Sequence, residues 1–162
     1  MSFEHKLKNW LGDCRKLVVL GIGNPLRGDD ALGLDILKIL KGKVSTSVGL
    51  IECQTTPENF TGKIKRLKPS HVLMIDAACF GANPGRARLV PPEKIAGVAV
   101  STHAMPLHML AEILEKSVGA KVVLLAVQPK IVDFGEGLTP ELEGALKKIG
   151  EQLLGVLGEV FS

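Results

Sequence analysis

The sequence is poor in aromatic residues and almost balanced in charge, and each shortage argues against a class of partner. Aromatic residues make up 4% of the 162 residues, with one Trp and no Tyr, which argues against a surface on which nucleic-acid bases stack. The 20 Lys and Arg residues barely outnumber the 17 Asp and Glu residues, which leaves a net charge of +3. Such a balance does not require a nucleic acid or an acidic membrane surface as partner, and we expect neither.

Long hydrophobic runs are also missing. The longest, Leu17–Ile22 and Val122–Val127, have six residues each, whereas a membrane-spanning helix needs about 20. The N-terminus shows no apolar segment behind basic residues, so we expect no signal peptide. The three cysteines, Cys14, Cys53 and Cys79, lie far apart and include no Cys-x-x-Cys pair, which argues against a disulfide framework or a zinc knuckle. We expect reduced thiols and a cytoplasmic location.

Several familiar catalytic motifs are absent too. The chain contains no His-Glu-x-x-His, no Gly-x-Ser-x-Gly and no Gly-Lys-Ser/Thr, so metzincin-type proteases, serine hydrolases and P-loop enzymes lose their sequence signatures. The composition, with 46% apolar and 23% charged residues, is that of an ordinary globular protein. Since domains average about 150 residues, we expect one domain over residues 1–162. Within it, an amphipathic N-terminal helix, 1–15, would dock on an α/β core, 16–162.

Short apolar runs alternate with amphipathic segments along this core. The runs are typical of strands buried on both faces, and the other segments have helical spacing. We predict strands at 16–22, 48–53, 71–76 and 121–127, a short edge strand at 86–90, irregular chain at 91–100, and helices at 31–40, 57–67, 105–117 and 139–157. The alternation predicts an α/β fold, a three-layer sandwich with a mainly parallel twisted sheet of about five strands and helices on both faces.

Acidic residues and a histidine stand where the predicted strands end. Asp30 closes the loop after the first strand, Asp76 ends the third, and His103 precedes the helix at 105–117. Because ligands bind beyond the carboxyl ends of such strands, we expect these three side chains on one rim. Two carboxylates and an imidazole suit a transition-metal site with an open position.

Each of these residues also has a structural interpretation. Of the adjacent pair Asp29 and Asp30, one could cap the helix that follows while the other favours its dipole. Asp76 could bond the N–H groups of a loop, and His103 could cap the next helix. His71, at the start of a predicted strand, is interpreted as structural.

The glycine-rich loop, 21–28, first suggests dinucleotide binding, but the match is poor. Leu26 stands where the third glycine of the fingerprint would be. Pro25 has no N–H to offer a phosphate, and Asp29 and Asp30 place negative charge where a pyrophosphate would lie. A nucleotide-binding α/β module therefore remains only an alternative.

Taken together, these segments resemble a known family, the endopeptidases that mature nickel–iron hydrogenases, and most of all the branch serving hydrogenases of the formate-hydrogenlyase type. The resemblance runs from about Lys16 to Thr139. It is carried by Gly21–Asp30, Ile75-Asp76-Ala77, Thr102–Leu107 and Gln128-Pro129, with Pro57-Glu58-Asn59 and Asn83-Pro84-Gly85 in support. Two departures are Glu52-Cys53-Gln54, where many relatives have a glycine-rich turn, and Ala31, where the closest relatives often have Gly.

The resemblance implies an aspartic-type endopeptidase that removes the C-terminal extension of a hydrogenase large-subunit precursor once nickel has been inserted. It implies that Asp30, Asp76 and His103 bind the metal and carry the catalysis, with nickel arriving inside the substrate as a recognition motif rather than being permanently bound. Asn24 and Thr102 are predicted to contact the substrate. Whether a metal-activated water or an Asp base performs the hydrolysis stays open, as does a maturation chaperone that binds metal without proteolysis. We expect a monomer.

Overall fold

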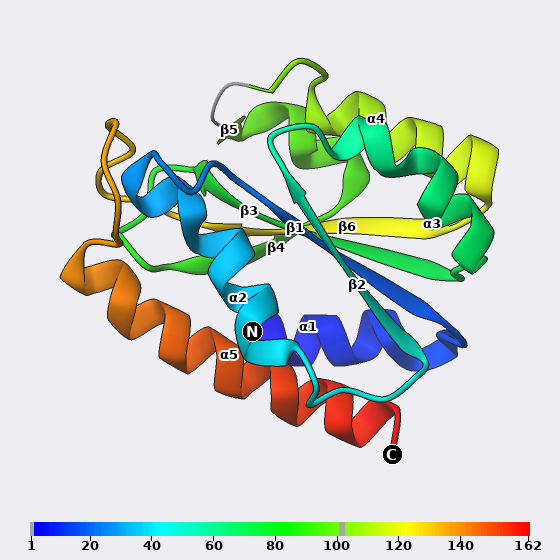
Figure 1. The fold of residues 1–162 in the computed structure, drawn as a ribbon. Coiled ribbons are helices and arrows are strands. Elements are labelled where there is room, and N and C mark those ends of the chain that lie inside the picture. Colours follow the sequence, from blue (N-terminus) through cyan, green and yellow to red (C-terminus); the bar gives the residue numbers. More distant parts are fainter. Residues whose placement is uncertain (1, 101–102) are drawn as a thin grey trace.

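The structure is a computed structural model that describes residues 2–100 and 103–162. A twisted, mainly parallel sheet forms its middle layer (Figure 1). The strands are β1 (Leu17–Ile22), β2 (Val48–Gln54), β3 (His71–Cys79), β4 (Ala87–Val90), β5 (Ala99–Val100) and β6 (Lys121–Val127). They lie in the order β2-β1-β3-β6-β4, and β5 pairs with β3 outside this path. β1, β2, β3 and β6 run parallel, whereas β4 lies at an edge, antiparallel to β6.

Helices cover both faces of this sheet (Figure 1). They are α1 (Phe3–Trp10), α2 (Leu32–Leu40), α3 (Thr61–Leu67), α4 (Leu107–Ile113) and α5 (Pro140–Val160). One apolar core holds Leu7 of α1, Leu32 of α2 and Leu153 of α5 against the sheet. A second core on the other face contains Ile64 of α3 and Leu110 of α4. The predicted α/β architecture, with helices on both sides of a mainly parallel sheet, is confirmed.

The burial of each strand follows its place in the sheet. Every residue of the central strand β1 is buried, as its continuous apolar run predicts. β2 mixes buried, partly buried and exposed residues, with Glu52 and Gln54 exposed, so the prediction that it is buried on both faces is wrong. β2 is the outermost strand on its side, and no neighbouring strand covers its outer edge. The edge strand predicted at 86–90 is confirmed as β4.

Three predicted segments differ from the structure in detail. Residues 91–100 are not irregular, because they form a 3₁₀ helix, Pro92–Gly97, followed by β5. The helix predicted at 57–67 starts as a 3₁₀ turn, Pro57–Phe60, before α3. The helix predicted at 105–117 begins later, at α4, and widens into a π-helical turn, Leu114–Val118.

A glycine lets α2 pack directly against the strand ends. A Cβ at Gly33 would lie 2.4 Å from the carbonyl oxygen of Ile22 and 2.5 Å from that of Ile75. Any side chain at this position would therefore push α2 away from β1 and β3. Since Asp76 follows Ile75 in β3, the close packing of α2 also fixes the backbone position next to Asp76.

Candidate active site

The candidate residues lie where parallel strands end. Asp76 belongs to β3, and Asp30 lies in a 3₁₀ turn, Gly28–Ala31, between β1 and α2. His103 follows the β5 segment, which pairs with the end of β3. The carboxyl ends of the parallel strands β1 and β3 share one edge of the sheet, and β5, which runs antiparallel to the end of β3, leads the chain back to the same edge before His103. The prediction that Asp30, Asp76 and His103 lie at one edge of the sheet depends on this arrangement of strands.

Asp76 and His103 form a buried hydrogen-bonded pair. Asp76 Oδ2 lies 2.7 Å from His103 Nε2. The Asp76 side chain is 0% exposed and that of His103 is 1% exposed. A carboxylate bonded to one ring nitrogen orients the imidazole and sets its tautomer. The structure thus brings together two of the three residues predicted to do the chemistry.

Burial and mutual charge shift the proton affinity of this pair. Burial raises the pKa of Asp76 to about 7, although the hydrogen bond and charge of His103 act against this rise. Burial by itself would lower the pKa of His103, but the hydrogen bond and charge of Asp76 outweigh it and raise that pKa. The pair therefore shares a proton near neutral pH, where proton transfer to and from a substrate is most efficient.

Asp30 lies close enough to act on the pair through its charge. It is 1% exposed, and its Oδ2 accepts the backbone N–H of Asn24 at 3.0 Å. Its negative charge contributes to raising the pKa of both Asp76 and His103. The three predicted residues therefore form one electrostatic unit.

Each residue of the pair has one further side-chain atom that could bind a metal or a substrate. Asp76 Oδ1 and His103 Nδ1 are buried and make no well-formed hydrogen bond to the described residues, although the backbones of Ala77 and Thr55 lie near enough to affect the two pKa values. A carboxylate oxygen and an imidazole nitrogen are ligands that nickel accepts. Nevertheless, no three His, Cys, Asp or Glu side chains in the described part of the chain are arranged to hold a metal ion. These residues fit nickel by their chemistry, and coordination by all three would need a rearrangement.

Asp29 has a role that the sequence did not reveal. Its Oδ2 accepts the N–H groups of Lys130 and Ile131 at 2.8 and 3.0 Å. Its Oδ1 accepts the backbone N–H of Thr139 at 2.8 Å, and the Thr139 hydroxyl also donates to the carboxylate. Thr139 is the N-cap of α5. The interpretation that Asp29 or Asp30 caps the helix after its own loop is wrong for Asp29, which instead holds the start of a distant helix.

Asn24 shapes the loop in which it lies. Its Oδ1 accepts the N–H of Leu26 at 2.9 Å, closing a local turn, and its own N–H goes to Asp30. Its predicted contact with substrate would therefore use the side-chain amide nitrogen. Thr102, the other predicted contact, lies outside the described residues. His103 does not cap a helix, because the N-cap of α4 is Pro106.

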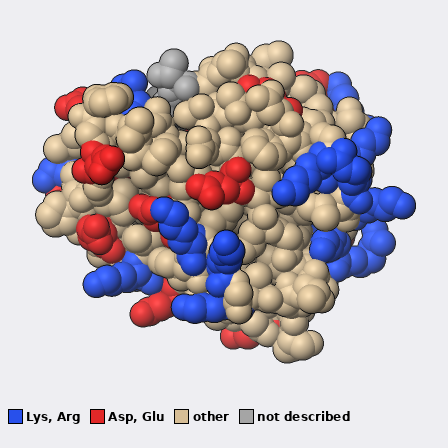
Figure 2. Space-filling view, viewed as in Figure 1, with Lys and Arg blue, Asp and Glu red and all other residues tan. Residues whose placement is uncertain are grey.

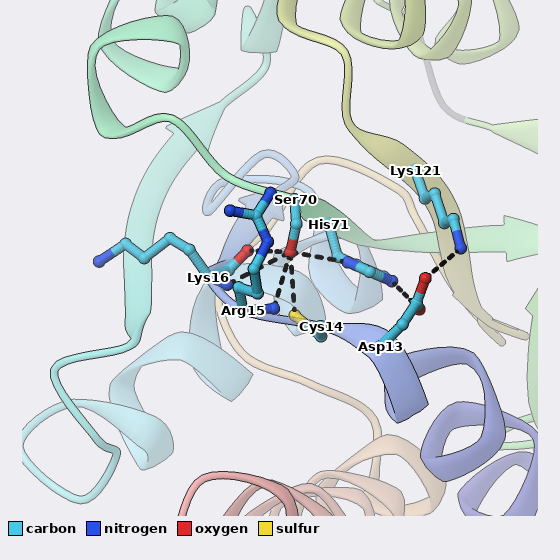
Figure 3. A network of polar contacts seen from close by, with 7 residues as sticks. All are labelled: Asp13, Cys14, Arg15, Lys16, Ser70, His71 and Lys121. Atoms are coloured by element: carbon cyan, nitrogen blue, oxygen red, sulfur yellow. Dashed lines mark hydrogen bonds and ion pairs between the residues drawn. The ribbon is translucent and has the colours of Figure 1, made fainter.

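A second polar cluster lies at the opposite edge of the sheet and has the order of a serine-protease triad (Figure 3). His71 Nδ1 lies 2.9 Å from Ser70 Oγ, and His71 Nε2 lies 3.1 Å from Asp13 Oδ1. However, Ser70 Oγ also accepts the N–H groups of Arg15 and Lys16, at 2.9 and 3.2 Å. With its lone pairs engaged, this hydroxyl is a poor nucleophile. The cluster ties the N-terminal segment to the sheet, in agreement with the structural role predicted for His71.

Comparisons with known proteins agree with this geometry. The profile of the HycI hydrogenase maturation protease family matches residues 34–156. A putative hydrogenase maturation protease of Methanocaldococcus jannaschii is 35% identical over 96% of this chain and 91% of its own length. The hydrogenase 3 maturation protease of Escherichia coli K12 is 32% identical over 85% of this chain and 88% of its own length.

Solved structures give the same result. The HycI maturation protease of Thermococcus kodakarensis superposes with a TM-score of 0.86, at 32% identity over 94% of this chain and 99% of that one. The HycI endopeptidase of Escherichia coli has a TM-score of 0.77, at 32% identity over 86% of this chain and 90% of that one. Fold and site thus define a protease built on an α/β sheet. The chain belongs to the hydrogenase maturation protease family, as its resemblance to that family predicts, and the nucleotide-binding alternative is set aside.

Proposed function

We propose that this protease removes the C-terminal extension of a nickel–iron hydrogenase large-subunit precursor after nickel has been inserted. The relatives named above support the reaction class. The buried Asp76–His103 pair, with one side-chain atom on each residue that makes no well-formed hydrogen bond to the described residues, is the observation that carries the assignment of the site. We assign catalysis and metal recognition to Asp30, Asp76 and His103, and substrate contact to Asn24 and Thr102.

Hydrolysis of a peptide bond needs a base for the attacking water and an acid for the leaving amine. Asp76 and His103 hold a proton between them near neutral pH, so the pair can accept a proton from water and return it to the leaving nitrogen. Asp30, buried beside them, stabilises the positive charge that the imidazole gains in this step.

In this proposal nickel is part of the substrate. The two carboxylates and the imidazole would complete the coordination of a nickel ion presented by the precursor, and the ion would polarise the scissile carbonyl. A precursor that lacks nickel offers Asp30, Asp76 and His103 no metal ion to bind, and so loses the interactions that the ion would supply. Since Asp76 and His103 are almost fully buried, the precursor must also open the site as it binds. Processing thus follows metal insertion.

The test is mass spectrometry of a purified hydrogenase precursor, with and without nickel, after incubation with the protein. We expect loss of the C-terminal extension only from the nickel-loaded precursor. His103→Ala should stop the reaction, whereas His108→Ala, which changes an exposed histidine on α4, should leave it unchanged. Normal trimming by His103→Ala, or equal trimming of both precursors, contradicts the proposal.

Solution properties complete the proposal. No helix of the described residues is long and apolar enough to cross a membrane. We infer a cytoplasmic monomer that meets its substrate by diffusion. Sedimentation of the purified protein, alone and mixed with precursor, tests the oligomeric state.

A further inference from the structure

Three large apolar side chains are exposed on two loops beside the site. Leu26, Ile131 and Phe134 are 44%, 46% and 82% exposed, and we call them the apolar ledge. Leu26 lies in the loop after β1, and the other two lie in residues 128–138, the loop between β6 and α5. In Figure 1 the second loop, coloured gold to orange, stands at the outer end of the molecule near the start of α2.

Backbone hydrogen bonds hold the two loops together, so the ledge has a defined backbone conformation. The N–H of Gly28 donates to Gly135 O at 2.8 Å, and the N–H of Gly135 donates to Leu26 O at 2.7 Å. The N–H of Asp29 donates to Ile131 O at 2.8 Å. Gly28 has φ +52°, and a Cβ there would lie 2.6 Å from Ile131 O. A fixed backbone therefore keeps apolar side chains in water, which is typical of an interaction site.

The ledge shares a loop with a residue of the candidate active site. The loop that carries Leu26 also carries Asp30, and the N–H of Asn24 donates to the Asp30 carboxylate at 3.0 Å. The same loop is joined to the second loop through Asp29, whose carboxylate binds the N–H groups of Lys130 and Ile131. A protein segment that rests on the ledge therefore contacts the same loop that carries Asp30.

The charge around the ledge indicates what such a segment carries. Phe134 is flanked by exposed Asp133 and Glu136, and these residues line a hollow of 240 Å³ within the loop. Two cations lie nearby. Lys130 pairs with Glu141, whereas Arg27 Nε donates to the Val132 carbonyl at 3.2 Å and keeps its charge, so one positive charge stands against the two carboxylates of Asp133 and Glu136. In Figure 2, Lys and Arg are densest on the right, whereas Lys or Arg and Asp or Glu are mixed on the left, the side on which Figure 1 places this loop. The ledge is thus apolar with an acidic border.

We propose that the apolar ledge docks a segment of the hydrogenase precursor in which an apolar residue stands beside Lys or Arg. This inference rests on the proposed function. Phe134 is the anchor, because large exposed aromatic side chains lose the most water-accessible surface on binding. Asp133 and Glu136 attract the basic neighbour and favour this partner over acidic ones. The ledge contributes affinity and orientation, whereas the chemistry stays with Asp30, Asp76 and His103.

The experiment measures binding and processing of nickel-loaded precursor by wild type and Phe134→Ser. We expect the dissociation constant and KM to rise about tenfold or more, with kcat within about twofold. Met109→Ser is the matched control, because Met109 is the other large apolar side chain exposed in the described part of the chain, at 46%. It should bind and process precursor normally. Since Phe134 is exposed, both variants should melt within about 2 °C of wild type.

The possible results of this experiment test the ledge proposal and the proposed function separately. If wild type processes the precursor and Phe134→Ser binds it equally well, the ledge proposal is overturned and the proposed function stands. If wild type binds but never trims the precursor while Phe134→Ser binds weakly, the ledge is supported and the function fails. If wild type neither binds nor trims it, both are overturned.

A charge variant tests the chemistry of the partner. The double variant Asp133→Lys with Glu136→Lys should weaken binding about tenfold at low salt, and the difference should shrink as salt is added. Glu151→Lys, an exposed position on α5, should have no such effect. Tighter binding by the double variant would show that the docked segment is acidic and would overturn the stated partner.

Discussion

The Asp29 carboxylate lies 2.8 Å from the backbone nitrogen of Thr139, across 110 residues of sequence. The carboxylate of the next residue, Asp30, has a different partner and accepts the N–H of Asn24. Two adjacent and equally buried acids therefore act in different places, one on the architecture and the other in the candidate active site.

Substitutions at these two acids should separate stability from activity. Asp29→Ala leaves the N–H groups of Lys130, Ile131 and Thr139 without their acceptor, and should lower the free energy of unfolding by about 3 kcal/mol. Asp30→Asn keeps the side-chain volume and should cost less than about 1 kcal/mol, while processing falls at least about a hundredfold. Urea unfolding and a mass-spectrometric processing assay measure the two effects. A fully stable Asp29→Ala would contradict the assigned role.

Asp76 and His103 should behave as one catalytic unit. Asp76→Asn and His103→Gln should each slow single-turnover processing by at least about a hundredfold. The double variant should be no slower than the worse single variant, because either change already disables proton transfer through the pair. Additive losses in this double-mutant cycle would show that the two side chains act independently.

His71 predicts a pH dependence of stability that is separate from the active site. Burial lowers the pKa of His71 despite the opposing charge of Asp13. The unfolded chain, with a His pKa of about 6.5, therefore binds the proton more readily than the folded protein. The stability due to neutral His71 is present above that pH and is lost as the pH falls below it.

This effect can be measured by comparison with a variant that does not titrate. Between pH 7 and pH 5, wild type should lose more unfolding free energy than His71→Gln. His108→Gln, at an exposed position, should follow wild type over the same range. Parallel curves for wild type and His71→Gln would contradict the pKa shift.

Gly33 should tolerate no side chain. Gly33→Ala places a methyl group against the carbonyl oxygens of Ile22 and Ile75 and should destabilise the protein by about 2 kcal/mol. Gly144→Ala, within α5 where nothing lies within 4 Å, should instead stabilise it by about 0.5 to 1 kcal/mol. Thermal unfolding of the two variants, compared with wild type, should show the loss of stability in Gly33→Ala and the gain in Gly144→Ala.

The sheet and its helices could be predicted from the sequence because local patterns determine them. The apolar run at Leu17–Ile22 and the start of α5 at Thr139 and Pro140 are local features. Parallel topology then places the ends of β1 and β3 on one edge, which is why Asp30 and Asp76 could be expected there. His103 reaches Asp76 through β5, an antiparallel strand in a segment predicted to be irregular. The partial exposure of β2 could not be expected, because strand order depends on pairing between distant segments.

The role of Asp29 and the apolar ledge had no signal in the sequence. The partners of Asp29 lie more than a hundred residues away, and nothing local distinguishes its carboxylate from that of Asp30. Exposure of Phe134 likewise depends on how the loop at 128–138 meets the first loop. The metal roles of Asp30, Asp76 and His103 and the substrate contacts of Asn24 and Thr102 stay predictions.

The bonds of Asp29 have a consequence for how the protein is made. Among the described residues, its carboxylate accepts hydrogen bonds from residues 130, 131 and 139, so a nascent chain that still lacks them on the ribosome cannot fix its first loop in this way. Because domains fold as units once their segments have emerged, the loop that carries Asp30 settles only late in translation. We therefore expect a truncated product that ends before Thr139, which also lacks α5, to lose protease activity.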